Sequence, residues 1–271
     1  MDGMTRVRIG LIGAGAIGGV VIERLLNGGG ARSDDMVACE VRDARREEIA
    51  QRYRVRTTTD PTDVSASDLV VIAIPPPEVA KTLAAIRDHL SHRPTIVSFA
   101  AAMPVAAIEA MLPRGTPVAR INPMSPSLVG EGFNPVTYGS SVIGPARNLV
   151  DRFLTALGKT VEIDDDKMNI YTALTAVGPT YFLPVLDAMI AAGVEAGLSR
   201  EAAVAAAVET AHGTAALVSQ RSESPEMLKL YTGLRPLKDE EVRDLVRRAI
   251  NDANTRMTTL QQKLAGGPAA G

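Results

Sequence analysis

The sequence predicts an α/β fold in two domains, a doubly wound parallel sheet over residues 1–163 and an all-helical domain over residues 164–271. Three observations lead to this prediction. A short apolar run near the start ends in closely spaced glycines and continues as a helix. Strand-like and helix-like segments then alternate, which is typical of parallel sheets. Beyond residue 164 almost every segment has helical periodicity instead.

The first element is a strand-like run over residues 7–12, after which Gly13, Gly15 and Gly18 stand in the spacing G-x-G-x-x-G. Residues 16–26 follow with the periodicity of a helix. In this context the first glycine permits a tight turn, the second lets a pyrophosphate approach the backbone, and the third lets helix and strand pack closely. The pattern indicates a Rossmann-type dinucleotide site at the helix N-terminus, whereas the alternative is a tight strand–helix connection without a ligand.

The remaining elements of the first domain follow in order from apolar runs, prolines and charged helix faces. We expect strands over residues 36–41, 69–74, 95–99 and 118–121, helices over 44–53, 77–89 and 105–111, and further alternating segments at 140–143, 146–157 and 160–163. The run at 69–74 is apolar throughout, as expected for a strand covered on both faces. Three prolines end this run, and Pro77, the last of them, suits the start of a helix.

The second domain is expected to consist of helices over residues 167–175, 180–196, 200–219 and 239–264. The apolar region 174–198 is interrupted by glycine, prolines and acidic residues, so we interpret it as a buried helix and not as a membrane span. Eight alanines make the helix 200–219 suited to close helix contact. Small and apolar faces all round predict a homodimer through this domain, with a higher assembly of dimers left open.

Composition limits the classes of function. A net charge of −2 and an aromatic content of 3% without tryptophan argue against a nucleic-acid-binding surface. The single cysteine, Cys39, cannot form an internal disulfide, and residues 1–5 lack the apolar core of a signal peptide, so we expect a cytoplasmic protein. The carboxylate run at 164–166 has no partnering histidines and is interpreted as a charge run at a helix start, so no metal site is expected.

Two signals at the end of the second strand conflict over the cofactor. Glu40 stands 22 residues after Gly18, where an acid would bind the ribose hydroxyls of NAD. Arg42, just beyond it, could instead hold the 2′-phosphate of NADP. Arg45 and Arg46 could serve the same purpose, although a solvated start of a charged helix explains them more simply. We therefore expect NADP because of Arg42, with NAD as the alternative.

Short motifs occur in a specific order along the chain, among them Arg-Ile-Asn-Pro-Met-Ser-Pro. They occupy residues 13–18, 73–75, 98–101, 120–126, 130–132, 172–181, 193–198 and 225–229. In this order and spacing the chain resembles the Δ1-pyrroline-5-carboxylate reductases over nearly its whole length. The resemblance implies a nucleotide-binding lobe and a helical dimerisation lobe. It also implies hydride transfer from NAD(P)H to the C=N bond of 1-pyrroline-5-carboxylate, which gives proline, or of a related small cyclic imine.

The resemblance also assigns residues by position. The cofactor would be lined by the glycine motif and by Ala16, Ile17, Arg42, Ala73, Pro75, Asn122 and Pro123. The loop facing the substrate would consist of Thr175, Ala176, Val177, Gly178 and Pro179. The sequence does not single out a proton donor, and we take Thr175 and Tyr231 as the catalytic candidates, with Tyr181 and His212 as further ones.

The departures from the family pattern concern the substrate. Ile74 stands where the family has a lysine, and the family's Ser-Pro-Gly-Gly-Thr-Thr segment after Lys229 is replaced by a shorter one. The anion-binding nest of two adjacent glycines is therefore missing. Arg235 or Lys238 could bind the substrate carboxylate instead, or either could be an ordinary surface cation. Two alternatives stay open: an oxidoreductase of a different small imino or keto acid, and a non-catalytic NAD(P)-binding regulatory protein.

Overall fold

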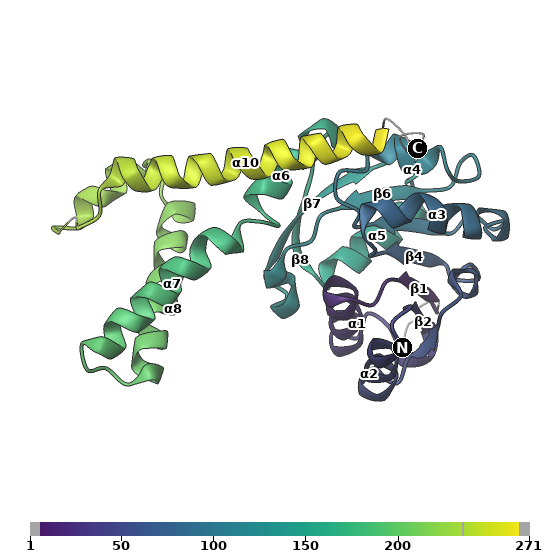
Figure 1. The fold of residues 1–271 in the computed structure, drawn as a ribbon, viewed down its shortest axis with the longest axis horizontal. Helices are drawn as coiled ribbons and strands as arrows, with labels where there is room; N and C mark the ends of the chain where they lie inside the picture. The colour runs from purple at the N-terminus through teal and green to yellow at the C-terminus, as the bar shows by residue number, and fades with distance from the viewer. Residues whose placement is uncertain (1–5, 235, 266–271) are drawn as a thin grey trace. The chain divides into compact units, whose positions relative to one another are not determined.

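The computed structural model of the chain describes residues 6–234 and 236–265 (Figure 1). By their internal contacts the residues form two compact units, the first made of residues 1–177 with 252–271 and the second of residues 178–251. This division differs from the boundary expected after residue 163. The helix α6 (Met168–Leu174) and the last part of α10 (Asp239–Ala265) belong to the same unit as the sheet.

An eight-stranded sheet forms the centre of the first unit, in the order β3-β2-β1-β4-β5-β6-β7-β8. The strands are β1 (Ile9–Ile12), β2 (Met36–Cys39), β3 (Arg56–Thr58), β4 (Leu69–Ile72), β5 (Thr95–Ser98), β6 (Val118–Ile121), β7 (Gly132–Tyr138) and β8 (Gly158–Glu162). Neighbouring strands are parallel except β6 and β7, which are antiparallel. The doubly wound sheet expected from the sequence is confirmed, with one antiparallel pair added.

Helices cover both faces of this sheet. Besides α6, the first unit contains α1 (Ala16–Asn27), α2 (Asp43–Tyr53), α3 (Pro76–Ile86), α4 (Val105–Glu109) and α5 (Pro145–Thr155). Buried side chains of α1, α2 and α5 form one apolar layer, and those of α3 and α4 form the other. Leu69 and Val71 of β4 belong to the first layer, and Val70 and Ile72 to the second. This alternation confirms that the apolar run is a strand covered on both faces.

Two strands, β7 and β3, are not indicated by the sequence pattern. The segment 140–143, expected to continue the alternation, forms a turn, and the strand β7 lies before it. Pro135 falls within β7 and lacks the N–H that a central strand normally donates, so it disguised the strand pattern. The other missed strand is β3, which has only three residues and lies at the edge of the sheet.

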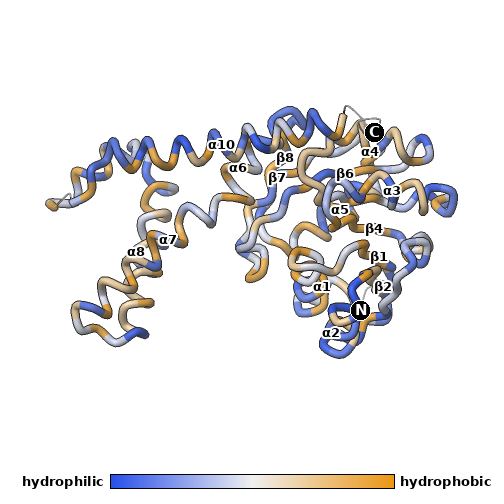
Figure 2. Tube along the Cα trace, in the orientation of Figure 1, coloured by the Kyte–Doolittle hydropathy of each residue, from blue (hydrophilic) through white to orange (hydrophobic). Residues whose placement is uncertain are grey.

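The second unit is helical, with α7 (Pro179–Glu195), α8 (Arg200–Gln220), α9 (Pro225–Leu228) and the first part of α10. Helices α7 and α8 pack together, and Figure 2 shows apolar residues along both. Contrary to the buried helix expected here, no residue of α7 is buried in the described chain. The stretch Asp165–Glu195 is long and apolar enough to cross a membrane by length and composition alone.

A buried ion pair ties the end of β6 to the segment that precedes α6. Arg120 on β6 is 1% exposed, and its Nη1 donates to Oδ1 of Asp165 at 2.7 Å. The other carboxylate oxygen of Asp165 accepts the Val105 N–H at the start of α4, at 2.8 Å. Burial lowers the pKa of the Arg120 guanidinium, and the charge of Asp165 opposes that effect. Asp165 thus has specific partners and is not simply part of a solvated charge run.

Removal of the Asp165 carboxylate should destabilise the fold, because it leaves the buried guanidinium of Arg120 without a counter-charge. We expect Asp165→Ala to lower the free energy of unfolding by about 3 kcal/mol. The matched control is Asp166→Ala, whose side chain is 69% exposed and pairs with Lys167. This control should change the free energy by less than about 0.5 kcal/mol. Urea unfolding followed by circular dichroism measures both, and equally small effects would contradict the structural role of the pair.

Candidate functional site

The glycine motif lies where β1 meets α1. Gly13 has a φ of +92°, and a Cβ there would lie 2.5 Å from the carbonyl oxygen of Ala73. A Cβ on Gly18 would lie 2.0 Å from the carbonyl oxygen of Gly13. Contacts this short exclude any side chain. These two glycines are therefore required by the turn and by the close packing of helix and strand.

Gly15 is different, because the fold leaves room for a side chain there. Among the described residues, only Nη2 of Arg42 would lie within 4 Å of a Cβ on Gly15, at 3.4 Å. Gly15 is the N-cap of α1, so it stands in front of backbone N–H groups that have no partner within the helix. An open position at a helix N-terminus suits a phosphate.

A cavity of about 550 Å³ lies over this loop, and a second cavity of about 170 Å³ shares Ile17, Ala73 and Ile74 with it. Both lie at the carboxyl ends of the central strands, where the strand order reverses between β1 and β4. The expected cofactor residues divide between them. Gly13, Gly15, Ala16, Ile17, Arg42, Ala73 and Pro75 line the larger cavity, and Ile17, Ala73, Asn122 and Pro123 line the smaller one. Gly18 lines neither, because it packs under the turn.

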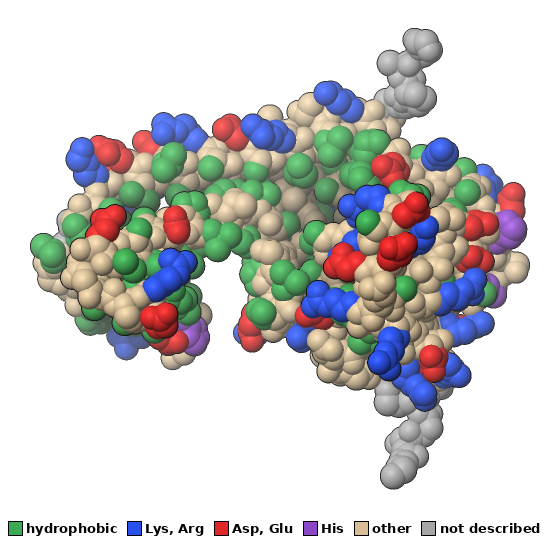
Figure 3. Space-filling view, turned by 60° about the horizontal axis from the view of Figure 1, so that its bottom comes forward, with side chains coloured by type: hydrophobic (Ala, Val, Ile, Leu, Met, Phe, Trp, Pro, Cys, Tyr) green, Lys and Arg blue, Asp and Glu red, His purple; other side chains and the backbone are tan. Residues whose placement is uncertain are grey.

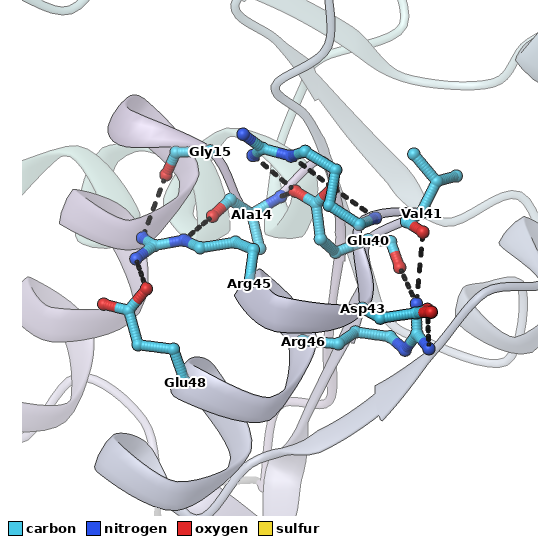
Figure 4. Close-up of polar contacts among 9 residues, drawn as sticks. Ala14, Gly15, Glu40, Val41, Asp43, Arg45, Arg46 and Glu48 are labelled. Carbon is cyan, nitrogen blue, oxygen red and sulfur yellow. Dashed lines mark hydrogen bonds and ion pairs between the residues drawn. The ribbon is translucent and has the colours of Figure 1, made fainter.

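The carboxylate of Glu40 organises the end of β2 (Figure 4). Glu40 is 6% exposed and accepts four hydrogen bonds. Oε1 accepts the backbone N–H and Nε of Arg42, both at 3.0 Å, and Oε2 accepts Nη2 of Arg42 at 3.0 Å and the Ala14 N–H at 3.2 Å. Burial alone would raise the pKa of Glu40, but the hydrogen bonds and charge of Arg42, with the Ala14 N–H, outweigh it and lower the pKa below its usual value. Glu40 is therefore ionised and fully engaged.

Arg45 holds the glycine loop from α2. Its Nε donates to the carbonyl oxygen of Ala14 at 2.7 Å and its Nη2 to that of Gly15 at 3.3 Å (Figure 4). Its Nη1 pairs with Glu48 at 2.6 Å. A Cβ on Gly19 would lie 2.3 Å from Nη2 of Arg45, so the fourth glycine of this region makes room for the guanidinium. Arg45 is thus part of the loop's support.

Arg46 also binds backbone, in contrast to the solvated helix start expected for it and for Arg45. Its Nη1 donates to the carbonyl oxygens of Glu40 and Val41 at 3.1 and 3.2 Å. The side chains of Arg45 and Arg46 are only 23% and 22% exposed. That of Arg42 is 62% exposed and lines the larger cavity. Of the three arginines, Arg42 is therefore the one placed to meet a ligand.

Asn122 connects the smaller cavity to α6. It is 8% exposed, and its side-chain amide donates to Oγ1 of Thr172, whose hydroxyl donates to the carbonyl oxygen of Met168 at 2.7 Å. Thr175 is 9% exposed, and its hydroxyl donates to the carbonyl oxygen of Tyr171 at 2.8 Å. The proton of the Thr175 hydroxyl is therefore engaged in the helix, and its oxygen is left as an acceptor.

The other substrate residues expected from the sequence are distributed over both units. Thr175, Ala176 and Val177 belong to the first unit, and Gly178, Pro179, Tyr231 and Lys238 to the second. The Tyr231 hydroxyl accepts from Arg221 at 3.2 Å, and Lys238 pairs with Glu241 at 2.9 Å on the surface. Arg235 lies outside the described residues. The roles of these side chains towards a substrate stay predictions.

Thiol and metal-ligand groups are sparse around this site. Cys39 lines the larger cavity but is buried, and burial raises its pKa to about 11, so the thiol is protonated at neutral pH. Across the described part of the chain, no three His, Cys, Asp or Glu side chains are grouped so that they could hold a metal ion. What the site offers is backbone N–H groups, one accessible guanidinium and apolar walls.

Two family descriptions match the sequence. "Pyrroline-5-carboxylate reductase dimerisation" matches residues 165–260, and "NADP oxidoreductase coenzyme F420-dependent" matches residues 8–102. Among solved structures, the pyrroline carboxylate reductase of Plasmodium falciparum with NADP bound has a TM-score of 0.83 at 20% identity, covering 96% of this chain and 100% of that one. The 1-pyrroline-5-carboxylate reductase of Streptococcus pyogenes has a TM-score of 0.80 at 20% identity, covering 94% and 100%. These two structures share the fold.

Sequence identity to a curated relative shows the family as well as the fold. The pyrroline-5-carboxylate reductase of Mycobacterium tuberculosis is 32% identical over 225 residues, which make up 81% of this chain and 76% of the relative. An identity of this size over most of both chains confirms the resemblance found in the motifs. The chain belongs to the pyrroline-5-carboxylate reductase family.

Proposed function

We propose that the protein is an NADP-dependent reductase of the C=N bond of 1-pyrroline-5-carboxylate, which gives proline, or of a closely related cyclic imino acid. Family membership and the names of its relatives support the reaction class. The observation that carries the proposal is Gly15: the fold leaves this position open before the N-terminus of α1, with Arg42 beside it. The cavity over it continues towards Asn122.

The two cavities suit the two halves of the cofactor. The N–H groups at the start of α1, in front of which Gly15 leaves space, suit the pyrophosphate. The exposed guanidinium of Arg42 suits the 2′-phosphate, because it offers a planar set of donors to an anion. The smaller cavity, with Asn122 and Pro123, then suits the nicotinamide ring.

Hydride transfer requires mainly that the protein place the nicotinamide ring and the imine carbon close together in the right orientation. Bound NADPH would supply a hydride to the imine carbon, and the imine nitrogen would take up one proton as the C=N bond becomes a C–N bond. Ile17, Ile74 and Phe99 give the smaller cavity apolar walls, which limit water near the reacting carbon. The Thr175 oxygen can accept an N–H from the substrate, because its own proton is directed to Tyr171. We therefore assign Thr175 to orienting the imine nitrogen, and Tyr231 remains the candidate proton donor.

We further propose a cytoplasmic homodimer through the helical unit. Phe182, Leu183 and Val185 of α7 are 68%, 59% and 56% exposed in the single chain. An apolar surface this dense marks an interface. The dimerisation family description covers the same region, residues 165–260. A partner subunit would cover the apolar stretch that otherwise has the length and composition of a membrane span.

The three glycines should separate into structural and ligand-binding positions. Gly18→Ala should destabilise the fold by more than about 2 kcal/mol, because the added methyl group meets backbone. Gly15→Ala should lower the free energy of unfolding by less than about 1 kcal/mol, the cost of alanine at an N-cap, but weaken NADP⁺ binding about tenfold or more. Urea unfolding and calorimetric titration measure the two effects. If Gly15→Ala bound NADP⁺ normally, the loop would not be the pyrophosphate site.

The dimer should depend on α7. Sedimentation velocity at micromolar concentration should show a dimer for the unchanged protein. Phe182→Glu should shift it towards the monomer, because a buried, unpaired charge at an interface is costly. Ile143→Glu is the control, since Ile143 is 72% exposed on the first unit. A stable monomer of the unchanged protein, or a dimer that tolerates Phe182→Glu, would contradict this interface.

The shortened segment after Lys229 should limit the use of 1-pyrroline-5-carboxylate. Without the glycine pair, the carboxylate depends on side chains such as Arg235 or Lys238, and loss of one charge-assisted pair costs about 2 kcal/mol, or tens-fold in affinity. We expect a kcat/KM on 1-pyrroline-5-carboxylate well below about 10⁶ M⁻¹s⁻¹, with a higher value for a related imine. Arg235→Ala with Lys238→Ala should lower it further, whereas Glu241→Gln, which frees Lys238, should not.

Steady-state kinetics with NADPH decide this prediction. An efficiency near 10⁶ M⁻¹s⁻¹, about mid-range for enzymes, that is unchanged by the double substitution would contradict it. Binding of NADP⁺ without turnover of any imine or keto acid would contradict the proposed reaction itself.

A further inference from the structure

We propose that Glu40 and Arg45 are positioning residues of the cofactor site. Glu40 holds the guanidinium of Arg42 for the 2′-phosphate of NADP, and Arg45 holds the glycine loop for the pyrophosphate. The proposal rests on the NADP-dependent function above and adds to it two residues that meet the cofactor only through others.

Glu40 occupies the place where an acid would accept the ribose hydroxyls of NAD, but its bonding prevents that role. A carboxylate has about four acceptor positions, and those of Glu40 receive two N–H groups and two guanidinium nitrogens. To accept a ribose hydroxyl, Glu40 would have to release Ala14 or Arg42. The acid at this position is therefore compatible with NADP, which resolves the conflict between the two signals in the sequence.

The same bonds fix the direction of Arg42. A guanidinium is planar with its donors at fixed angles, and Glu40 binds the edge formed by Nε and Nη2. The edge formed by Nη1 and Nη2 is left for an anion, and within the described residues Nη1 makes no hydrogen bond. Nη2 stands 3.4 Å from the position of a Cβ on Gly15. Without Glu40, a side chain that is 62% exposed would be free to take many rotamers.

Glu40 and Arg45 both bind the backbone of Ala14 in the glycine loop, Glu40 at its N–H and Arg45 at its carbonyl oxygen. Ala14 is fully buried, its N–H donates to Glu40, and its carbonyl oxygen accepts from Nε of Arg45 (Figure 4). The adjacent carbonyl oxygen of Gly15 also accepts from Arg45. The loop is therefore held in its binding conformation before a ligand arrives, which lowers the entropic cost of binding. The positive charge of Arg45 also lies beside the loop that meets the pyrophosphate.

The test compares four substitutions in the full chain, each checked for its thermal unfolding midpoint: Arg42→Ala, Glu40→Gln, Arg45→Met and Arg46→Met. Arg46 is the matched control, because it too binds backbone carbonyl groups from α2, but at the end of β2 and not in the glycine loop. Dissociation constants for NADP⁺ and NAD⁺ are measured by isothermal titration calorimetry at one fixed salt concentration. The ratio of the two constants is the readout that a merely structural role would not move.

We expect Arg42→Ala to weaken NADP⁺ about thirtyfold and to leave NAD⁺ within about twofold. Glu40→Gln should weaken NADP⁺ about fivefold and move the ratio in the same direction, because it frees the Arg42 side chain. Arg45→Met should weaken both cofactors equally, by about tenfold, and Arg46→Met should change neither by more than about twofold. In the Arg42→Ala background, Glu40→Gln should not change the ratio further.

The outcomes distinguish a failure of the NADP-dependent function from a failure of the positioning roles of Glu40 and Arg45. An unchanged NADP⁺ constant in Arg42→Ala would overturn the NADP-dependent function. With that variant behaving as expected, Glu40→Gln that leaves the ratio unchanged, or strengthens NADP⁺ relative to NAD⁺, would overturn the role of Glu40. A shift of the ratio in Arg45→Met, or no loss of affinity there, would overturn the role of Arg45. If Glu40→Gln fails to fold, Glu40→Asp replaces it: the charge stays, but the shorter side chain cannot reach both the Ala14 N–H and the guanidinium of Arg42, so NADP⁺ should again weaken about fivefold with the same change in the ratio.

Discussion

The buried carboxylate of Glu40 is the constraint on which the cofactor edge of the sheet depends. A charge at 6% exposure is stable only with partners, because an unpaired buried carboxylate costs several kcal/mol or takes up a proton. Its partners come from the glycine loop, at Ala14, and from the next turn of chain, at Arg42. The ends of β1 and β2 are thereby joined through one side chain, and the accessible guanidinium takes its direction from that junction.

A second buried charge fixes the other end of the site. Arg120 pairs with Asp165 just before α6, and two residues after Arg120 the amide of Asn122 bonds Thr172 on the same helix. These contacts hold α6, and with it Thr175, against the carboxyl end of β6. Polar contacts between segments far apart in the sequence therefore hold Glu40 in the wall of the larger cavity and Asn122 in the wall of the smaller one. A reaction that depends on placing two ligands accurately gains most from walls of this kind.

Local sequence patterns predicted most helices and strands. The features that they did not predict depend on contacts between residues far apart in the sequence. The roles of Gly13 and Gly18 and the strand from Leu69 follow from spacing and apolar runs, because those features depend on neighbours in the chain. The strand β7 was hidden by Pro135, whose missing N–H breaks the usual strand pattern. Arg45 and Asp165 seemed to be surface charges, because their partners lie 31 and 45 residues away. No spacing in a single sequence reveals such pairs.

A crystal structure of the protein with NADP⁺ and proline bound tests the roles of Glu40 and Arg42 most directly. We expect the 2′-phosphate at about 3 Å from the Nη1 and Nη2 edge of Arg42, with Glu40 still accepting the Ala14 N–H and the N–H groups on the other edge of Arg42. A structure in which Glu40 accepts a ribose hydroxyl while Arg42 has turned away would contradict it.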